Sequence, residues 1–199
     1  MDEPRKFFGK YRGVAMDTLD PLALGRILVE CPALSGALLN WAMPCVPYAG
    51  AGVGAFVVPP IGASVWVEFE GGDPDYPVWT GCFWTEGQSP FVEGPTSVLK
   101  TNTVTVTVDD RPEGANFDLS VEPNGGDPIR ISAGVGGLTI TVGAIRLSAM
   151  DGAVTVASGG SLLTLTPDTA ALSAGSASLF LAEDMVQITG KVFFDDQPA

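Results

Sequence analysis

The sequence predicts an all-β protein in two parts, and three observations support this. Short runs alternate apolar and polar residues, whereas no stretch shows the longer 3.6-residue period of an amphipathic helix. The chain of 199 residues contains 25 Gly and 16 Pro, a composition that indicates many turns. Finally, an aromatic-rich first half gives way, after Glu86, to an array of Val, Thr, Ile, Leu and Ser. We expect a small barrel followed by a second β domain.

The barrel is expected to begin after a polar, mixed-charge extension at residues 1–20. Residues 25–30 (GRILVE) read as the first strand, and residues 32–40 as a loop or a short helical turn. Residues 41–44 (WAMP) begin the next strand, and residues 47–54 form a glycine-rich connection. With the hairpin that follows, these segments make about five strands, the size of a small OB barrel.

The clearest element is a hairpin within residues 59–84 (PPIGASVWVEFEGGDPDYPVWTGCFW). Residues 65–70 alternate inward and outward positions, as a half-buried strand does. Residues 71–75 (GGDPD) supply turn chemistry, because glycine reaches positive φ, Asp closes an Asx turn and Pro fixes φ. Residues 76–84 resume with β-branched and aromatic side chains, so the segment predicts two strands joined by a longer loop.

This stretch resembles a known family. The pattern includes Pro59, Gly62, Phe69, Gly72, Asp73, Pro74, Pro77 and Gly81, together with the preceding residues 41–44 and 49–54. Over residues 22–88 it is similar to the OB-fold domain of contractile-tail spike proteins, the phage baseplate assembly protein V family and the VgrG proteins of type VI secretion.

The resemblance implies a domain plan and a set of partners. The plan is an extension at 1–20, an OB-fold domain at 21–88, a linker at 89–96 and a β-helical needle at 97–199. The implied partners are two further copies in a homotrimer, the inner tube and baseplate proteins, and a PAAR-type tip protein. Because only about 20 residues precede the first expected strand, the hub is expected to be a separate protein. Assembly is expected in the cytoplasm, as part of the baseplate of a virion or injection particle.

The second half independently favours an intertwined trimer. Short strands recur roughly every 8 to 10 residues, for example at 103–108, 138–142, 154–156 and 186–189. Between Ala133 and Ala182 only Arg146, Asp151 and Asp168 are charged, which is sparse for a solvated surface. A single sheet of such strands would leave exposed edges, whereas three chains wound into a triple-stranded β-helix would pair them. The alternative is a monomeric parallel β-helix.

Composition limits the other function classes. A formal net charge of −13 argues against nucleic acid, because phosphate contacts need clustered Lys and Arg. It also disfavours adhesion to anionic lipid, so contact with a target membrane is expected to be mechanical. Cys31, Cys45 and Cys82 have no spacing that predicts a disulfide framework or a zinc site. The N-terminus has no apolar segment typical of a secretory signal.

Catalysis has little support in the sequence, and we expect no enzyme activity, metal or cofactor. The chain has no histidine, which excludes histidine-based triads and ligand sets. Glu68 and Glu70 are better explained as a solvated strand face than as a catalytic carboxylate pair. Asp73 and Asp75 lack further ligands at EF-hand spacing, and residues 50–54 (GAGVG) lack the Lys-Ser/Thr of a phosphate loop.

Two aromatic groups are candidate contact sites. Phe7, Phe8 and Tyr11 could dock on the barrel itself or on a hub protein. Val192, Phe193 and Phe194 could seat the tip protein or cap the needle's own core.

The predicted function is the structural central spike of a contractile injection system or phage tail. It would link the hub to a tip protein and pierce the target envelope. The alternative is an OB-fold module that binds oligosaccharide on a β-solenoid stalk. An enzyme such as a polysaccharide hydrolase is a third option, for which no acidic cleft can be located.

Overall fold

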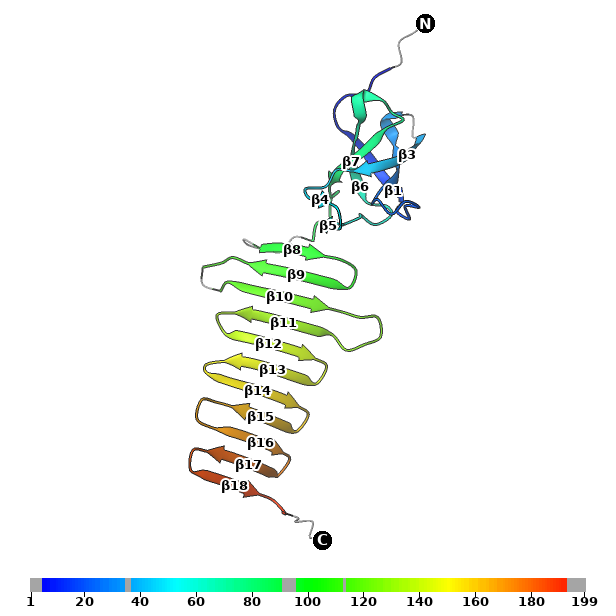
Figure 1. The fold of residues 1–199 in the computed structure, drawn as a ribbon. Helices are drawn as coiled ribbons and strands as arrows, with labels where there is room; N and C mark the ends of the chain where they lie inside the picture. Colours follow the sequence, from blue (N-terminus) through cyan, green and yellow to red (C-terminus); the bar gives the residue numbers. More distant parts are fainter. Residues whose placement is uncertain (1–4, 35–36, 91–95, 113, 193–199) are drawn as a thin grey trace. The chain divides into compact units, whose positions relative to one another are not determined.

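The computed structural model describes residues 5–34, 37–90, 96–112 and 114–192, which form two compact units divided after Ser89. The first unit is a closed five-stranded barrel in the order β1-β2-β3-β7-β6. Its strands are β1 (Tyr11–Asp17), β2 (Ile27–Cys31), β3 (Ala37–Pro44), β6 (Ser64–Phe69) and β7 (Pro77–Cys82). A short hairpin, β4 (Ala49–Gly50) and β5 (Val53–Gly54), and two 3₁₀ turns, Pro32–Leu34 and Glu70–Gly72, complete the unit (Figure 1). The predicted barrel is therefore confirmed.

Alternating side chains fill the barrel. The buried positions of β2 and β6 are every second residue, and Ile27, Val29, Val65 and Val67 are all fully buried. Trp79 of β7 closes the core, and its indole Nε1–H donates to the Gly25 carbonyl at 3.2 Å. These side chains give the unit a hydrophobic core of its own.

The barrel begins earlier than we predicted. Residues 11–17 were assigned to an extension, yet they form β1, which pairs with both β2 and β6. Gly13 explains why the apolar alternation is weak there. A Cβ at Gly13 would lie 2.5 Å from Val29 Cγ1 and 3.1 Å from Val67 Cγ2, so this inward position accepts only glycine without displacing neighbours.

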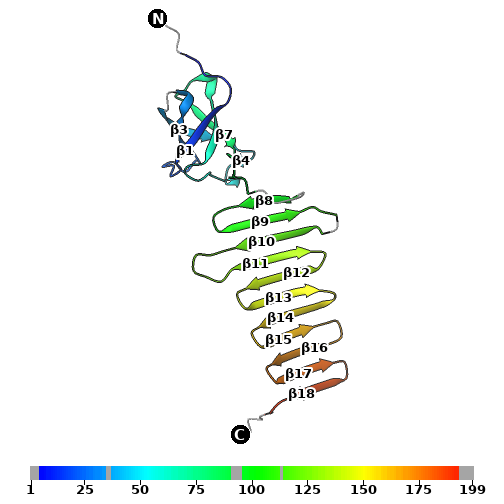
Figure 2. The same cartoon turned by 180° about the vertical axis from the view of Figure 1, so that it is seen from behind.

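The second unit is one antiparallel sheet of eleven strands in sequence order. Figures 1 and 2 show the sheet from its two sides, and no other described element of this unit lies over either side. The strands are β8 (Thr96–Lys100), β9 (Val104–Asp109), β10 (Asn116–Val121), β11 (Ile129–Gly134), β12 (Gly137–Val142), β13 (Ile145–Met150), β14 (Ala153–Ser158), β15 (Ser161–Leu165), β16 (Ala170–Ala174), β17 (Ala177–Ala182) and β18 (Met185–Thr189).

The intertwined β-helix that we predicted is not what the single chain forms. Each strand pairs with its neighbours in the same chain, mostly through two-residue turns such as 143–144 and 159–160. Such tight turns make consecutive strands antiparallel partners, so only the outer edges of β8 and β18 stay open. The inner strands therefore have no unpaired edges, whereas both faces of the sheet are uncovered within the described second unit.

The sheet has a 16-residue repeat from Ile129 onward. Each repeat contains two strands and two turns, so equivalent positions such as Gly143, Gly159 and Gly175 fall at the same edge. Equivalent turns are two strands apart, about 9.6 Å at the usual strand spacing. Successive repeats therefore present the same faces and edges along the sheet.

Candidate interaction surfaces

One face of the sheet is almost entirely apolar. Register places one Leu, Ile or Val from each strand in a single central row, because cross-strand partners point to the same face. The row is Leu99, Val106, Leu119, Ile131, Ile140, Leu147, Val156, Leu163, Leu172, Leu179 and Ile188. We call this surface, with the rows on either side, the apolar face.

Nothing in the described second unit covers the apolar face. Leu172 in the central row is 49 % exposed, and Phe117, Ile145 and Leu165 in the flanking rows are also exposed. Ser97, Ser158 and Ser161 are the polar side chains in the described part of this face. Ten strand spacings give the face a length of about 48 Å. An apolar patch of this extent marks an interaction surface.

The opposite face is polar and rich in hydroxyl groups. Thr139, Ser148, Thr155 and Thr164 follow one another across β12 to β15. The Ser148 and Thr155 hydroxyls are 2.5 Å apart and hydrogen-bonded, so part of this face satisfies its own polar groups. We call it the polar face.

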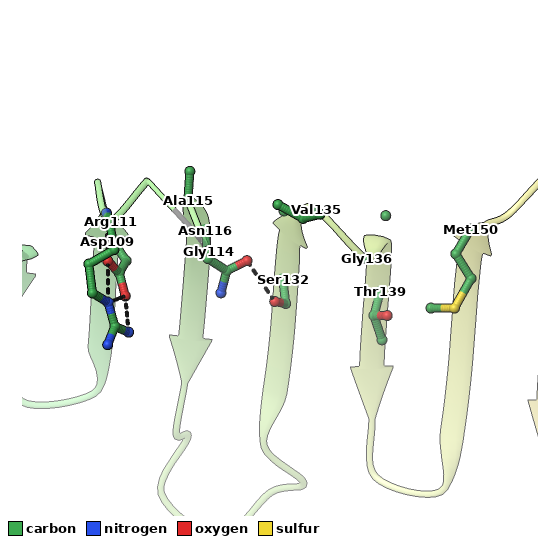
Figure 3. A pocket seen from close by; sticks show the side chains of 12 residues that line it. Asp109, Arg111, Gly114, Ala115, Asn116, Ser132, Val135, Gly136, Thr139 and Met150 are labelled. Carbon is green, nitrogen blue, oxygen red and sulfur yellow. Dashed lines mark hydrogen bonds and ion pairs between the residues drawn. The ribbon is translucent and has the colours of Figure 1, made fainter.

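A shallow hollow of about 400 Å³ lies on the polar face between β9 and β13 (Figure 3). Its floor includes Gly134 and Gly137, which pair across β11 and β12 without side chains. Arg111 lies at one end, where its guanidinium is hydrogen-bonded to Asp109 and holds the pKa of that carboxyl below its usual range. Ser132 donates to Asn116 at 3.4 Å. The acidic and basic groups are thus paired with each other, and the hollow offers no free acid–base pair.

Of the barrel's two ends, one carries the N-terminal aromatic residues. Phe7 and Tyr11 pack against Phe69, with ring centroids 6.0 and 5.5 Å away, and the Phe7 N–H donates to the Gly72 carbonyl. Phe8 instead is 71 % exposed. The structure therefore places two of the three predicted hub residues on the barrel itself and one at its surface.

The other barrel end displays apolar side chains on loops. In the loop between β1 and β2, Leu19, Leu22 and Leu24 are exposed, and Phe56 lies next to Gly25. No charged residue occurs from Cys31 to Val67, a stretch that includes the adjacent β3–β6 connection. This end therefore combines exposed leucines with a connection that carries no charge.

Asp20 fixes the shape of the leucine-bearing loop. Its carboxylate accepts N–H groups from Leu22, Leu24 and Arg26 at 2.8 to 3.2 Å, and the Arg26 guanidinium at 2.6 and 3.0 Å. The Asp20 side chain is only 3 % exposed. Arg26 first, and then the backbone donors, hold the pKa of Asp20 far below its usual range despite the desolvation that raises it. Sequence reasoning missed this residue, because its partners follow a loop that turns back on itself.

The family-pattern residues lie mainly in turns and strands of the barrel. Gly62, Gly72 and Gly81 have positive φ of 86°, 74° and 139°. Phe69 belongs to the core, and Pro77 begins β7. Asp73 Oδ1 accepts the Asp75 N–H at 3.1 Å, which is the predicted Asx turn. Pro59 and Pro74 occupy the connections before β6 and before β7.

The remaining predicted positions are the acidic residues of the barrel and the apolar residues at the end of the sheet. Within the described residues there is no group of three or more His, Cys, Asp or Glu side chains that could hold a metal ion. Glu68 pairs with Lys10 at 2.8 Å on the barrel surface. Val192 is exposed, whereas Phe193 and Phe194 lie outside the described residues. No helix among the described elements has the length and apolarity to cross a membrane.

The comparisons with known proteins concern the barrel. A search of curated proteins finds no match to this chain. A family model described as the type VI secretion system/phage-baseplate injector OB domain matches residues 11–84, from the start of β1 to just after β7. The match includes β1 and the predicted hairpin. Residues 11–84 are therefore similar to the injector OB domain of type VI secretion systems and phage baseplates.

Proposed function

We propose that this protein is the central spike of a contractile injection system or phage tail, and that three copies form its needle. The observation that carries the proposal is the apolar face, which follows a barrel similar to an injector OB domain in the same chain. A single sheet with one uncovered apolar face has no core, so burial must come from other molecules. Three sheets around one axis bury these faces together and leave the polar faces outside.

Side-chain size favours three sheets over two. The central row is uniformly Leu, Ile or Val, whereas the row beside turns 159–160 and 175–176 contains Ser158, Ser161, Ala174 and Ala177. In a three-sided core, the middle of each sheet faces the central space and its margins meet the neighbouring sheet in a narrow wedge. From β14 to β17, the small residues on this side of the central row fit such a wedge, since protein cores are closely packed.

The needle is suited to a mechanical role. Each inner strand is hydrogen-bonded on both sides within its own chain. From Gly152 to Ala182 the only charge is Asp168, in a turn, so this stretch of the sheet has little charge to desolvate on entering an envelope. We propose that it transmits force to a small area of the target envelope.

The test is the solution mass of the full chain by light scattering. We expect a particle of three times 20.6 kDa that resists dilution. Leu163→Asp places a charge in the central row and is expected to abolish that particle. Thr164→Asp is the matched control, since the next residue along β15 points to the polar face. A monomeric wild type, or equal loss in both variants, would contradict the proposal.

We also propose that Phe8 contacts a separate hub protein. Phe7 and Tyr11 are packed on Phe69, so they hold the segment in place while Phe8 remains exposed. Phe8→Ala should lose capture of the hub protein of the same baseplate without changing barrel stability, whereas Phe7→Ala should lower that stability. Hub capture that survives Phe8→Ala would count against this contact.

A tip protein at the other terminus completes the proposed spike. Val192 is exposed at the end of the described chain, and the sequence continues with Phe193 and Phe194. Truncation after Lys191 should remove binding of a PAAR-type tip protein and leave the trimer mass otherwise unchanged. An intact tip complex with the truncated chain would refute this role.

A further inference from the structure

The turns of β12 to β18 divide into two chemically different edges. One edge contains the turns 143–144, 159–160 and 175–176, which we call the glycine edge. The other contains the turns 151–152, 166–169 and 183–184, which we call the acid edge. In Figure 1 the glycine edge is on the right of the sheet and the acid edge on the left. Because of the 16-residue repeat, each edge keeps its character from β12 to β18.

All charges in these six turns lie on the acid edge. They are Asp151, Asp168, Glu183 and Asp184. None of the four forms an ion pair within the part of the chain that the structure describes. The glycine edge consists of Gly-Ala, Gly-Gly and Gly-Ser. Two acid edges placed together would therefore oppose like charges, which destabilises an interface, whereas a glycine edge beside an acid edge would not.

At one position of the glycine edge, the fold of a single chain would accept a larger residue than glycine. Gly159 and Gly175 have φ of 55° and 58°, which the tight turns need. Gly160 does not have positive φ, and no heavy atom lies within 4 Å of the place where its Cβ would be. The fold of one chain thus leaves space at Gly160 that it does not use.

The apolar face shows a matching difference in side-chain size from β14 onward. Beside the glycine edge lie Ser158, Ser161, Ala174 and Ala177. Beside the acid edge lie Val154, Leu165, Leu181 and Val186, interrupted by Ala170. A corner made from two glycine edges would be underfilled, and one from two acid edges would be overfilled. A corner made from one edge of each kind balances the volumes, as close packing requires.

We infer that copies of this chain meet cyclically, with the glycine edge of each copy against the acid edge of the next. This inference rests on the proposed multi-copy needle and specifies how its corners are built. Turn 159–160 lies between β14 and β15, level with the gap between turns 151–152 and 166–169 on the opposite edge. In a ring related by rotation, Asp151 and Asp168 of the next copy therefore straddle Gly160. Backbone N–H groups of turn 159–160 could donate hydrogen bonds to these carboxylates.

Cross-linking of the full chain tests this arrangement. Cys45 and Cys82, which are exposed, are replaced by Ser, and buried Cys31 is kept. Gly160→Cys and Asp168→Cys are introduced together and separately, and treated with a short bismaleimide. We expect covalent trimers from the double variant and no cross-link from either single variant. The two edges of one chain are about 17 Å apart across a five-residue strand, so a linker shorter than this reports contacts between chains.

The outcomes separate this inference from the proposed function. Cross-linking of either single variant would mean that like edges meet, which overturns the inference. A trimeric mass with no cross-link in the double variant would also overturn it, while the spike proposal stands. A monomeric mass of the uncross-linked wild type would overturn both.

Charge at the glycine edge provides a second test. Gly160→Asp would face the carboxylates of the next copy, whereas Gly160→Asn adds nearly the same volume without charge. We expect Gly160→Asp to lower the melting temperature of the assembly at low salt and added salt to restore part of it, since salt screens exposed charges. Equal effects of the two substitutions, unchanged by salt, would show that no acid edge lies opposite.

Discussion

The barrel and the sheet contain the same kind of strand but obtain their stability differently. The barrel closes on itself and buries Ile27, Val29, Val65 and Val67 completely. In the described part of the sheet, Ser148 is the only residue that is buried, and it is polar. A closed sheet makes a core from one chain, whereas an open single sheet can only supply one side of a core. The barrel therefore has a core of its own, whereas the sheet leaves its apolar face uncovered within the described second unit.

Fluorescence can separate the two units. All four tryptophans, Trp41, Trp66, Trp79 and Trp84, lie in the first unit. Tryptophan emission therefore follows unfolding of the barrel, while far-ultraviolet circular dichroism follows both units. The predictions below use this difference.

The largest expected effect comes from truncating the barrel core. Ile27→Ala removes a fully buried side chain and should destabilise the barrel by about 2–5 kcal/mol. The loss, measured by tryptophan fluorescence in denaturant, should not depend on protein concentration. Leu147→Ala in the central row is the comparison; its effect on the sheet, followed by far-ultraviolet circular dichroism, should grow as the protein is diluted. A concentration-independent loss in Leu147→Ala would mean that the sheet is stable in a single chain.

A smaller effect is expected from adding one methyl group inside the barrel. Gly13→Ala places a Cβ 2.5 Å from Val29 Cγ1 and should destabilise the barrel by roughly 1–3 kcal/mol through overpacking. Gly136→Ala, in a turn of the sheet with no heavy atom within 4 Å, is the control and should change stability by less than about 0.5 kcal/mol. Equal unfolding curves for the two variants would contradict the close packing at Gly13.

Asp20→Asn should weaken the barrel in a pH-dependent way. The folded pKa of Asp20 is lowered, so its ionised form stabilises the barrel above the usual carboxyl pKa of about 4. That contribution is lost as the pH falls from there through the folded pKa. The melting temperature of the wild-type barrel should exceed that of Asp20→Asn at pH 7, and the difference should shrink below about pH 4. A constant difference across this range would rule out titration of Asp20 as its cause.

The smallest effect is expected at the barrel surface. Lys10 pairs with Glu68 at 2.8 Å, and both side chains are about half exposed. Lys10→Ala should therefore cost no more than about 1 kcal/mol, and less at high salt. A larger, salt-independent loss by the same fluorescence measurement would show that Lys10 also contributes through its bond to the Thr80 hydroxyl.

The sequence predicts those elements whose side chains alternate clearly. The hairpin of β6 and β7 was predicted because Val65 and Val67 alternate with Trp66 and Glu68 and a turn-rich loop follows. The pairing of the two strands confirms it. β1 was missed because its inward positions are Gly13 and Ala15, which carry little apolar signal. The local sequence pattern cannot show that the side chains of Val29 and Val67 pack against the backbone of Gly13.

The second half was predicted as strands, but these strands were expected to pair between three intertwined chains, whereas they pair within one chain. Turns such as 159–160 determine that neighbouring strands pair within one chain, and two-residue glycine turns are readable in the sequence. The regular 16-residue spacing of Gly143, Gly159 and Gly175 could have shown that every second turn lies at the same edge of the sheet. The role of Asp20 required the folded loop, since three backbone donors converge on its carboxylate.

Because of the 16-residue repeat, deletions or insertions of whole repeats would change the length of the sheet in fixed steps. Removing residues 145–160 would join turn 143–144 directly to Ser161 and delete two strands, about 9.6 Å of length. Every remaining side chain would keep its face, and every remaining turn its edge. Removing eight residues would instead transfer all later turns to the opposite margin. Related proteins could therefore differ in sheet length by whole repeats, each of which adds or removes a pair of strands.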